Sequence, residues 1–529
     1  MLWIALHLPL LSLESFAATR VPQAAGASDE PSHAPPIALI DAHRIVSAND
    51  SAHALGVKSG LKRATALALA PHITLGQADA ARDRQAMSSV AHAALAFTPS
   101  VTLEPWDDPT TAPHTVLLEV QASLRYFGGR DKLLRRLRAA LAPLKHRVHC
   151  ASAPTAQGAA LLARLPEASE GRHAADPPTL KRMLNAAPVG LLGPGREHWE
   201  ALQGMGLHTV ADFRGLPRSG LARRFGEALL DELDRACGVR PDPRRWVSLP
   251  ETFSSRLELF ARADTTEQVL HGASILLARL VAWAGAQHAQ VRRFTLHMQH
   301  EPRHRHGAHT PSDSTLEIAL AEPSRDAAHL LVLLRERLAH LQLVAPTLEL
   351  RLSCNDIARR APPNAELFPT AKSEREGLTR LIERLQARLG CEQVQRLAPV
   401  ADHRPECGSM LRPAEALVQP APLPAGSRHL RSAPNGNAPA AGRQRPVWLL
   451  AEPQPLPEQQ MRPLLDGRPL QLLCGPERIE TGWWDTALAE RDYFIAQAGD
   501  GALVWIYRAR LPMSVSEHGQ GWFLQGRFG

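Results

Sequence analysis

The chain has 529 residues, too many for a single hydrophobic core, so several domains are expected. Hydrophobic residues make up 44% of it, which excludes a largely disordered chain. The net charge of +7, from 60 basic and 53 acidic residues, fits a polyanionic partner and an ordinary arginine-rich protein equally well.

Cysteine usage and the N-terminus bear on the compartment. The six cysteines are scattered without a CxxC pair, which argues against a disulfide framework or zinc site and fits a reducing cytoplasm. Residues 1–18 are apolar and end in small residues like a signal peptide, but no Lys or Arg precedes them, and Pro9 and Glu14 interrupt them. We therefore expect a buried strand at 2–8 and a cytoplasmic protein. No other segment approaches the roughly 20 apolar residues that span a bilayer.

Strands and helices alternate over the first 170 residues, which predicts an α/β or α+β domain. Apolar runs predict the strands, and apolar spacing of three and four residues predicts the helices. The expected strands lie at 2–8, 37–40, 44–47, 115–120 and 147–151, and the expected helices at 64–69, 80–97, 130–142 and 156–165.

A glycine-containing turn lies within the mostly helical stretch 178–245. Gly204, Gly206, His208 and Thr209 follow the pattern of a helix-hairpin-helix, in which backbone N–H groups at the start of the second helix hold a DNA phosphate. A plain corner between two helices would need the same glycines. The hairpin alone leaves both interpretations open.

Residues 252–355 predict a small sheet covered on one face by helices. The expected helices lie at 266–284 and 324–340, and the expected strands at 291–299, 314–320 and 347–353. Arg292, Arg293, His297 and His300 would make the open face of this sheet basic. We therefore expect Arg292 and Arg293 to contact DNA.

The composition changes after residue 400. Residues 420–445 are rich in Pro, Ala, Gly and Arg without periodicity, which predicts a flexible linker. The final segment predicts a small β-rich domain. Its tryptophans Trp483, Trp484 and Trp505 could form a core or an aromatic contact surface, and core is the default expectation.

Several strings over residues 1 to about 355 resemble the Y family of translesion DNA polymerases. They are Val-Ser-Ala-Asn at 46–49, Ala-Leu-Gly-Val-Lys-Ser-Gly at 54–60, and Leu-Glu-Val-Gln-Ala-Ser-Leu-Arg-Tyr-Phe-Gly-Gly at 118–129. The resemblance implies a multidomain α+β right hand with an added β-rich domain. The implied parts are a palm-like domain (1–10 and 85–170), a fingers-like domain (11–84), a thumb-like domain (178–245), a little-finger-like domain (252–355), a clamp-binding segment (356–375), the linker (420–445) and a C-terminal protein-interaction domain (446–529).

The resemblance also implies that the catalytic carboxylates are missing. Family members hold two Mg²⁺ ions with carboxylates, and the matching positions here are His7, Pro9, His114 and Thr115. Two histidines without a third ligand make a poor site for zinc, copper or nickel. We therefore expect no metal, no cofactor and no catalysis; an active translesion polymerase with unconventional ligands is the alternative.

The nucleotide pocket implied by the resemblance is altered too. Active relatives carry Asn-Tyr-Glu-Ala-Arg where this chain has Asn49, Asp50, Ser51, Ala52 and His53, and Asp50 would repel a triphosphate. A later basic residue of the family is replaced near Ala160. The loss of the metal ligands and the loss of the phosphate contacts therefore both predict that the chain is not catalytic.

A short peptide after the small sheet resembles a sliding-clamp motif. Leu367 and Phe368 match its apolar end, Asn364 replaces its glutamine, and flanking prolines favour an extended chain. A loop hydrophobe packed on its own domain is the other interpretation. The resemblance implies DNA, the sliding clamp (beta), an error-prone polymerase of the replicative alpha-subunit type and a RecA-like protein as partners, and no membrane. It implies a role in damage-induced (SOS) mutagenesis and DNA repair; a plain DNA-binding protein without an assembly role is the weaker rival.

Overall fold

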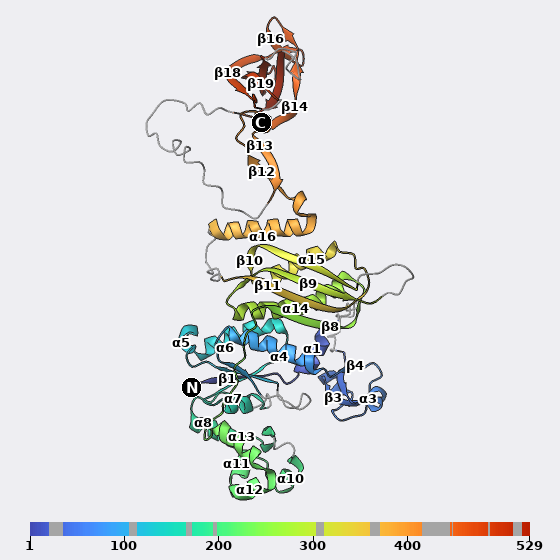
Figure 1. The fold of residues 1–529 in the computed structure, drawn as a ribbon, viewed down its shortest axis with the longest axis vertical. Helices are drawn as coiled ribbons and strands as arrows, with labels where there is room; N and C mark the ends of the chain where they lie inside the picture. Colours follow the sequence, from blue (N-terminus) through green and yellow to red (C-terminus); the bar gives the residue numbers. More distant parts are fainter. Residues whose placement is uncertain are drawn as a thin grey trace. The chain divides into compact units, whose positions relative to one another are not determined.

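The computed structural model describes residues 1–20, 35–104, 114–165, 172–193, 198–302, 312–359, 371–414, 445–446, 448–484, 487–510 and 521–528. The clamp-like peptide with Asn364, Leu367 and Phe368, and all but the end of the expected linker, lie outside these residues. The chain forms two compact units, residues 1–388 and 389–529. Their mixed helices and sheets confirm the multidomain α+β class with a C-terminal β-rich part (Figure 1).

The first sheet is built around the N-terminal strand β1 (Trp3–His7). The strand β6 (Thr115–Glu119) pairs with one edge of β1, and β7 (His149–Ala153) pairs with the other. A short strand, β5 (Val101–Leu103), continues the sheet beyond β6, giving the order β5-β6-β1-β7, all antiparallel. The predicted buried strand at the N-terminus is therefore confirmed, as a central strand of this sheet.

Alternation along β1 sends successive side chains to opposite faces of the sheet. Ile4 and Leu6 pack with the helices α4 (Ala80–Leu95) and α6 (Arg130–Leu141). Trp3 and Ala5 pack on the other face with the helix α7 (Ala156–Ala163). His7 continues the second set, so its side chain belongs to the α7 face.

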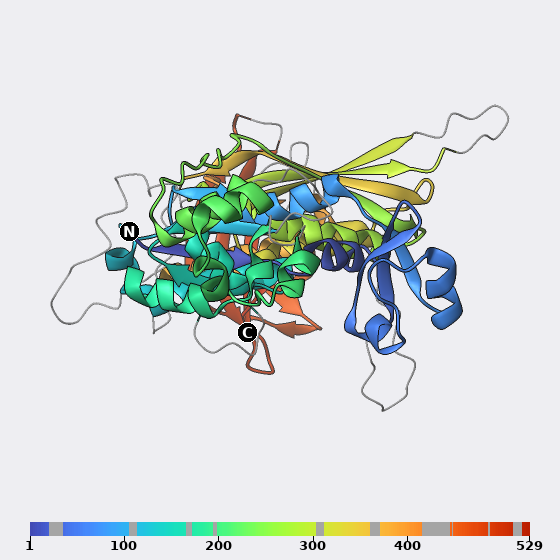
Figure 2. The ribbon, with the colours of Figure 1, turned by 90° about the horizontal axis from the view of Figure 1, so that it is seen from below.

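A small lobe follows the first helix, α1 (Leu11–Ala18). Its strand β2 pairs with β3 as the predicted hairpin and with β4 in parallel (Figure 2). Asn49 caps the next helix, because its side chain accepts hydrogen bonds from the backbone N–H groups of Ala52 and Ile37, both at 3.0 Å. The lobe comprises β2 (Ile37–Asp41), β3 (Arg44–Ala48), α2 (Asp50–Ala54), α3 (Arg63–Leu69) and β4 (Thr74–Gln77).

The stretch from 177 to 237 is helical, as predicted. Its apolar side chains join those of α7 and the α7 face of the first sheet in one core. Its helices are α8 (Pro177–Ala186), α10 (Trp199–Gly204), α11 (Val210–Arg214), α12 (Arg218–Phe225) and α13 (Glu227–Cys237). Short 3-10 turns elsewhere are η1 (Ala142–Leu144), η2 (Val189–Leu191), η3 (Cys391–Gln393) and η4 (Pro405–Cys407).

A second antiparallel sheet has the order β10-β9-β11-β8, with helices packed on its apolar face. The strand β8 (Phe253–Ala263) was not predicted, because its buried residues alternate with charged ones and leave no apolar run. The expected helices and three strands are confirmed as α14 (Thr266–Ala286), β9 (Gln290–His300), β10 (Asp313–Ser324), α15 (Ala327–Ala339) and β11 (Thr347–Ala358).

Helix α14 corrects one expectation. It is 21 residues long with a mean hydropathy of 1.5, and so passes, by length and composition, as a segment able to cross a membrane. Within that segment 56% of the residues are buried inside the protein. Trp283 of α14 is fully buried, and Arg279 reaches Gln85 of α4 at 3.0 Å. Its apolar length therefore serves the core between the second sheet and α4.

A helix that was not predicted, α16 (Ala371–Leu389), ends the first unit. The second unit holds the predicted β-rich domain, a five-stranded sheet in the order β14-β21-β20-β19-β18. The strands of the whole second unit, including those outside this sheet, are β12 (Gln395–Pro399), β13 (Ser409–Pro413), β14 (Trp448–Leu456), β15 (Glu458–Gln459), β16 (Arg462–Leu465), β17 (Arg468–Pro469), β18 (Gln471–Thr481), β19 (Ala489–Gln497), β20 (Leu503–Ala509) and β21 (Gly521–Arg527).

Candidate functional site

The sheet register brings the predicted site residues together at one end of β1. His7 lies opposite Thr115 on β6 and opposite His149 on β7. The Nδ1 atom of His7 is 3.2 Å from the hydroxyl of Thr115, and the rings of His7 and His149 lie edge to face with centroids 6.2 Å apart. His114 precedes β6, and its carbonyl accepts a hydrogen bond from the N–H of Leu8 at 2.8 Å. His7, His114 and Thr115 thus form one cluster, with exposed Pro9 just beyond it.

The histidines of this cluster are held neutral. Burial, reinforced by the positive charge of Arg164, lowers the pKa of His7 to about 3. Burial alone lowers the pKa of His114 to about 4. At neutral pH both imidazoles are uncharged, so neither side chain supplies negative charge that would attract a divalent cation.

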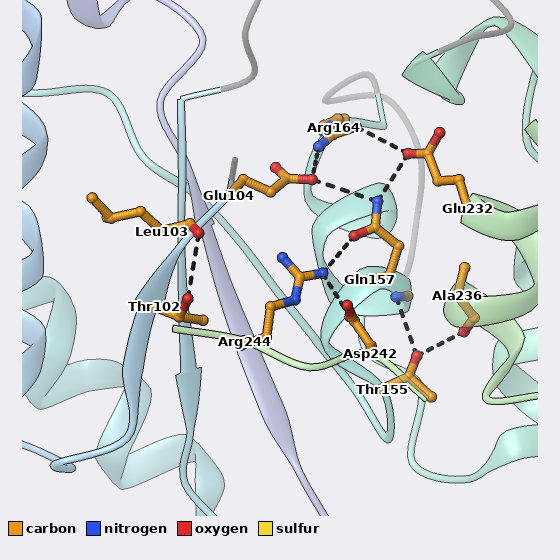
Figure 3. A network of polar contacts seen from close by, with 11 residues as sticks. Thr102, Leu103, Glu104, Thr155, Gln157, Arg164, Glu232, Ala236, Asp242 and Arg244 are labelled. Carbon is orange, nitrogen blue, oxygen red and sulfur yellow. Dashed lines mark hydrogen bonds and ion pairs between the residues drawn. The ribbon is translucent and has the colours of Figure 1, made fainter. Parts of the chain in front are cut away.

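Figure 3 shows a buried polar network whose Arg164 acts electrostatically on His7. Arg164, directly after α7, forms a close ion pair with Glu104 and lies 3.9 Å from Glu232 on α13. The amide nitrogen of Gln157 donates to Glu232 at 2.8 Å, and its oxygen accepts from Arg244 at 2.7 Å. The network therefore ties the first sheet to α13 and to the segment after it.

Two of the acids of the network, Glu104 and Glu232, are buried in contact with Arg164. Glu104 and Arg164 are each about one-twentieth exposed at the side chain. Burial raises the pKa of Glu232 against the opposing pull of Arg164. Sequence analysis missed this network because its members come from β5, α7, α13 and the chain beyond, and no local pattern connects them.

The donor set at this site does not fit two magnesium ions. Mg²⁺ prefers carboxylate oxygens, whereas the cluster offers neutral imidazoles and one hydroxyl. The nearby carboxylate, Glu104, is paired with Arg164, whose positive charge would repel a metal ion. Among the residues that the structure describes, no group of three or more His, Cys, Asp and Glu side chains is placed to hold a metal ion.

The residues at the triphosphate motif have local structural roles. Asn49 caps α2, Asp50 lies in its first turn and His53 in its last, where the helix dipole favours such side chains. Ala160 is fully buried in α7 among apolar neighbours. A basic side chain at that position would have to enter the core.

The glycine-containing turn joins α10 to α11 as predicted, with Gly206 at a φ of 73°. However, the carboxylate of Asp212 accepts from the N–H groups of His208 (3.2 Å) and Thr209 (2.9 Å). These bonds hold the pKa of Asp212 below its usual range. The α11 end thus already carries an anion, so a phosphate held by the N–H groups of His208 and Thr209 is not supported.

The open face of the second sheet is not basic, contrary to expectation. Arg293 is paired with Glu317 at 3.0 Å and lies 3.8 Å from Asp356. Arg256 on β8 is paired with Glu349 on β11 at 2.5 Å. This face therefore presents paired charges, around an open hollow of 630 Å³ lined largely by polar side chains.

The two histidines of that stretch divide between the faces. His297 lies on the open face with its Nε2 atom 3.0 Å from Ser353, and burial lowers its pKa. His300 points into the core at 1% exposure and contacts Ser314. Arg292 is exposed at the start of β9. DNA binding through Arg292 and Arg293 stays a prediction, without the basic face that motivated it.

The tryptophans of the second unit are not all core residues. Trp505 is 2% exposed, as expected, but Trp483 is 80% exposed and Trp484 is 55% exposed. The two exposed rings contact each other edge to face with centroids 5.4 Å apart. The core expectation is therefore wrong for this pair.

The chain is similar in sequence to one kind of known protein and in fold to several solved structures. Protein ImuB of Caulobacter vibrioides, in each of two strains, is 29% identical over 494 residues, which cover 90% of this chain and 100% of that protein. No family model matches the chain. Among solved structures, the match to an insertion ternary complex of Dbh DNA polymerase covers 68% of this chain and 100% of that chain, with a TM-score of 0.37 and 16% identity. The match to DinB from Sulfolobus solfataricus covers 68% of this chain and 99% of that chain, also with a TM-score of 0.37 and 16% identity. TM-scores this low carry no inference about the site.

Proposed function

Taking the chain as a homologue of ImuB, we propose that it is a non-catalytic, DNA-binding adaptor. In this role it links the sliding clamp to an error-prone polymerase during damage-induced translesion synthesis. The observation that carries the proposal is the His7 cluster, where neutral imidazoles and a hydroxyl stand at the sheet end and Arg164 pairs with the adjacent carboxylate.

Nucleotidyl transfer gives the physical reason. Two divalent cations neutralise the charge that develops on the phosphates and position the attacking hydroxyl. Such ions need carboxylate ligands in a region of negative potential. The His7 cluster supplies neither, and Arg164 adds a fixed positive charge beside it.

Primer extension with Mg²⁺ or Mn²⁺ tests this proposal directly. We expect no incorporation by the purified chain. Any trace activity should be identical in a His7→Ala, Thr115→Ala double variant, because it would come from a contaminating polymerase. Incorporation by the wild type that the double variant loses would overturn the proposal.

Binding to primer–template DNA is the second component. The net charge of +7 supports a backbone-driven contact whose affinity falls as salt rises, because Lys and Arg contacts release counterions. Electrophoretic mobility shifts at two salt concentrations measure this. An affinity that does not depend on salt, or no binding at low salt, would contradict it.

The clamp contact is assigned to Leu367 and Phe368, with Asn364 in the place of a glutamine. Burying both apolar side chains contributes on the order of 3–6 kcal/mol before ordering costs. Leu367→Ala with Phe368→Ala should nearly abolish capture by the sliding clamp and leave DNA binding intact, while Asn364→Gln should strengthen capture. Full clamp affinity in the double alanine variant would refute the assignment.

The remaining proposed partners are the alpha-subunit-type polymerase, ImuC, and the RecA-like ImuA. The second unit is the proposed contact surface for proteins. It carries as many acidic as basic side chains, so it has no net charge to attract DNA. Its exposed Trp483 and Trp484 are of the residue type that anchors protein interfaces.

A further inference from the structure

A basic patch lies on the face of the first sheet opposite the His7 cluster. It is formed by the short helix α5 (Leu124–Phe127) and by α6, both labelled in Figure 1. Helix α6 packs its leucines against the sheet together with Ile4 and Leu6, so its other side faces solvent. The exposed side chains of this surface, here called the α5–α6 patch, are Arg125, Tyr126, Lys132, Arg135 and Arg136.

The α6 charges of the α5–α6 patch lie close together on one helix face, and none of them is held in an ion pair within the described residues. Lys132, Arg135 and Arg136 recur at the three- and four-residue spacing of one helix face. The acid of this helix, Asp131, is paired with Arg130 at 3.1 Å. Within the described residues, no ion pair is recorded for the five members of the patch.

Some exposed arginines elsewhere in the chain do have an acidic partner. Arg218 pairs with Asp234 at 2.6 Å, and Arg293 pairs with Glu317 at 3.0 Å. Like charges brought together on one helix face destabilise it slightly, so an unpaired cluster has no benefit to the fold. Such a cluster fits a polyanionic ligand that supplies the missing negative charge.

An exposed aromatic ring stands at the end of this patch. Tyr126 is 82% exposed, and its ring meets Phe127 edge to face with centroids 4.9 Å apart. Phe127 is fixed in turn by Phe97 at 5.2 Å and by the guanidinium of Arg136, 5.8 Å from its ring centroid. A tyrosine held in this way offers a flat apolar surface next to three cations.

That combination selects among polyanions. Phosphate contacts need only the cations, but a flat ring adds affinity only when a base is free to stack on it. Bases in a duplex are already stacked on each other, and an acidic protein segment has no need of the ring. Unpaired nucleotides satisfy both parts of the patch.

We propose that the α5–α6 patch binds single-stranded DNA, with Lys132, Arg135 and Arg136 holding phosphates and Tyr126 stacking on a base. This contact lies on the sheet face away from the His7 cluster and adds to the primer–template binding of the proposed function. It would let one chain hold a duplex and an adjoining unpaired strand at separate places.

Fluorescence anisotropy with the full chain tests this, using labelled oligothymidine as the single strand and a blunt hairpin as the duplex. The patch variant is Lys132→Gln, Arg135→Gln, Arg136→Gln. The matched control removes equal charge from exposed positions of the second unit, Arg396→Gln, Arg412→Gln, Arg462→Gln. All changed side chains are exposed, and unfolding curves verify that each variant folds.

We expect the patch variant to bind oligothymidine at least tenfold more weakly and its log–log salt slope to fall by about 2, since each lost phosphate contact removes about 0.7. The control should bind like the wild type. Tyr126→Ala should weaken oligothymidine binding about tenfold, in the range of base stacking on an aromatic ring, and Tyr126→Phe should keep it. Hairpin binding should survive in every variant.

Three results would overturn the inference. Unchanged oligothymidine affinity in the patch variant removes the site. Equal losses in the patch variant and the control reduce it to overall charge. A loss in the patch variant without one in Tyr126→Ala excludes base stacking and reduces the site to phosphate contacts that a duplex could make equally well. Failure of the wild type to bind primer–template DNA would instead contradict the proposed function, so the two failures are distinguishable.

Discussion

The core of the first sheet and the Trp483–Trp484 pair of the second unit depart from ordinary burial in opposite directions. The first sheet buries ionisable groups, since Glu104 and Arg164 are almost fully enclosed beside His7. The second unit exposes large aromatic rings, those of Trp483 and Trp484. Buried charges and exposed tryptophans are both uncommon, so each needs its own physical explanation.

The two regions differ in whether their unusual side chains find partners within the chain. In the first sheet the buried charges of Glu104, Arg164 and Glu232 pair with one another, and these contacts hold α13 to the sheet. In the second unit the rings of Trp483 and Trp484 are exposed, which suits the protein contact proposed above. The buried charges of the first sheet thus serve the fold, whereas the exposed rings of the second unit are available for the proposed protein contact.

The largest effect is expected from breaking the buried pair. Arg164→Met leaves the carboxylate of Glu104 buried without its cation, which should lower the free energy of unfolding by about 3–5 kcal/mol. Urea unfolding of the variant and the wild type measures this. The matched control is Arg164→Met combined with Glu104→Leu, which removes both charges and should restore much of the loss. Equal losses in the single and double variants would show that packing, and not charge, holds α13 to the sheet.

Much of the fold could be predicted from the sequence because apolar periodicity is local. Local apolar patterns were enough to predict the strand at 2–8, the hairpin at 37–47 and the helices α4, α6 and α14. Strand β8 was missed because charged residues alternate with its buried ones, and only pairing with β11 explains its presence.

The site was harder to predict because its contacts are long-range. The sequence located His7, His114 and Thr115, and register alone brings them together. It could not show that Arg164 meets Glu104, sixty residues away, or that Asp212 already occupies the start of α11. The expected basic face failed for the same reason, because Glu317 and Glu349 come from other strands.

A smaller effect is expected from pH. The pKa of His7 is lowered to about 3 in the folded chain, so the unfolded chain, with an ordinary histidine, binds more protons below neutral pH. The contribution of His7 to the free energy of unfolding is therefore fully present above pH about 6.5. It is lost as the pH falls toward the pKa of His7 in the folded chain. At pH 5, His7 should account for about 2 kcal/mol of this loss.

Replacing His7 by glutamine sharpens this prediction, since an amide can still contact Thr115 but does not titrate. The His7→Gln chain should lose less stability than the wild type between pH 7 and pH 5, measured by urea unfolding at each pH. His53→Gln, at an exposed position, serves as the substitution control. An unchanged pH dependence in His7→Gln would show that the imidazole is not held neutral by burial.

The smallest effect in free energy, and the one that separates the two units most cleanly, is expected at the exposed tryptophans. The residue before the two rings, Gly482, has a φ of 82°, and a side chain there would collide with the carbonyl oxygen of Ala487. Arg404 donates to the same carbonyl at 2.9 Å and lies 5.9 Å from the ring centroid of Trp484. The ring of Trp484 therefore has a neighbour that orients it, which reduces the entropy lost when a partner covers that ring.

Trp483→Ala should weaken binding of the protein partner about tenfold, or about 1.4 kcal/mol, while changing the free energy of unfolding by less than about 0.5 kcal/mol, because an exposed ring contributes little to its own fold. Isothermal titration with the alpha-type polymerase and, separately, with the RecA-like protein measures the first quantity, and urea unfolding measures the second. Trp448→Ala is the matched control, since Trp448 is 71% exposed on β14. Equal weakening by both variants would mean that the partner reads general hydrophobicity and not the Trp483–Trp484 pair. A large loss of stability in Trp483→Ala would mean that the ring serves the fold after all, and the contrast between the two units would then fail, because both departures from ordinary burial would be structural.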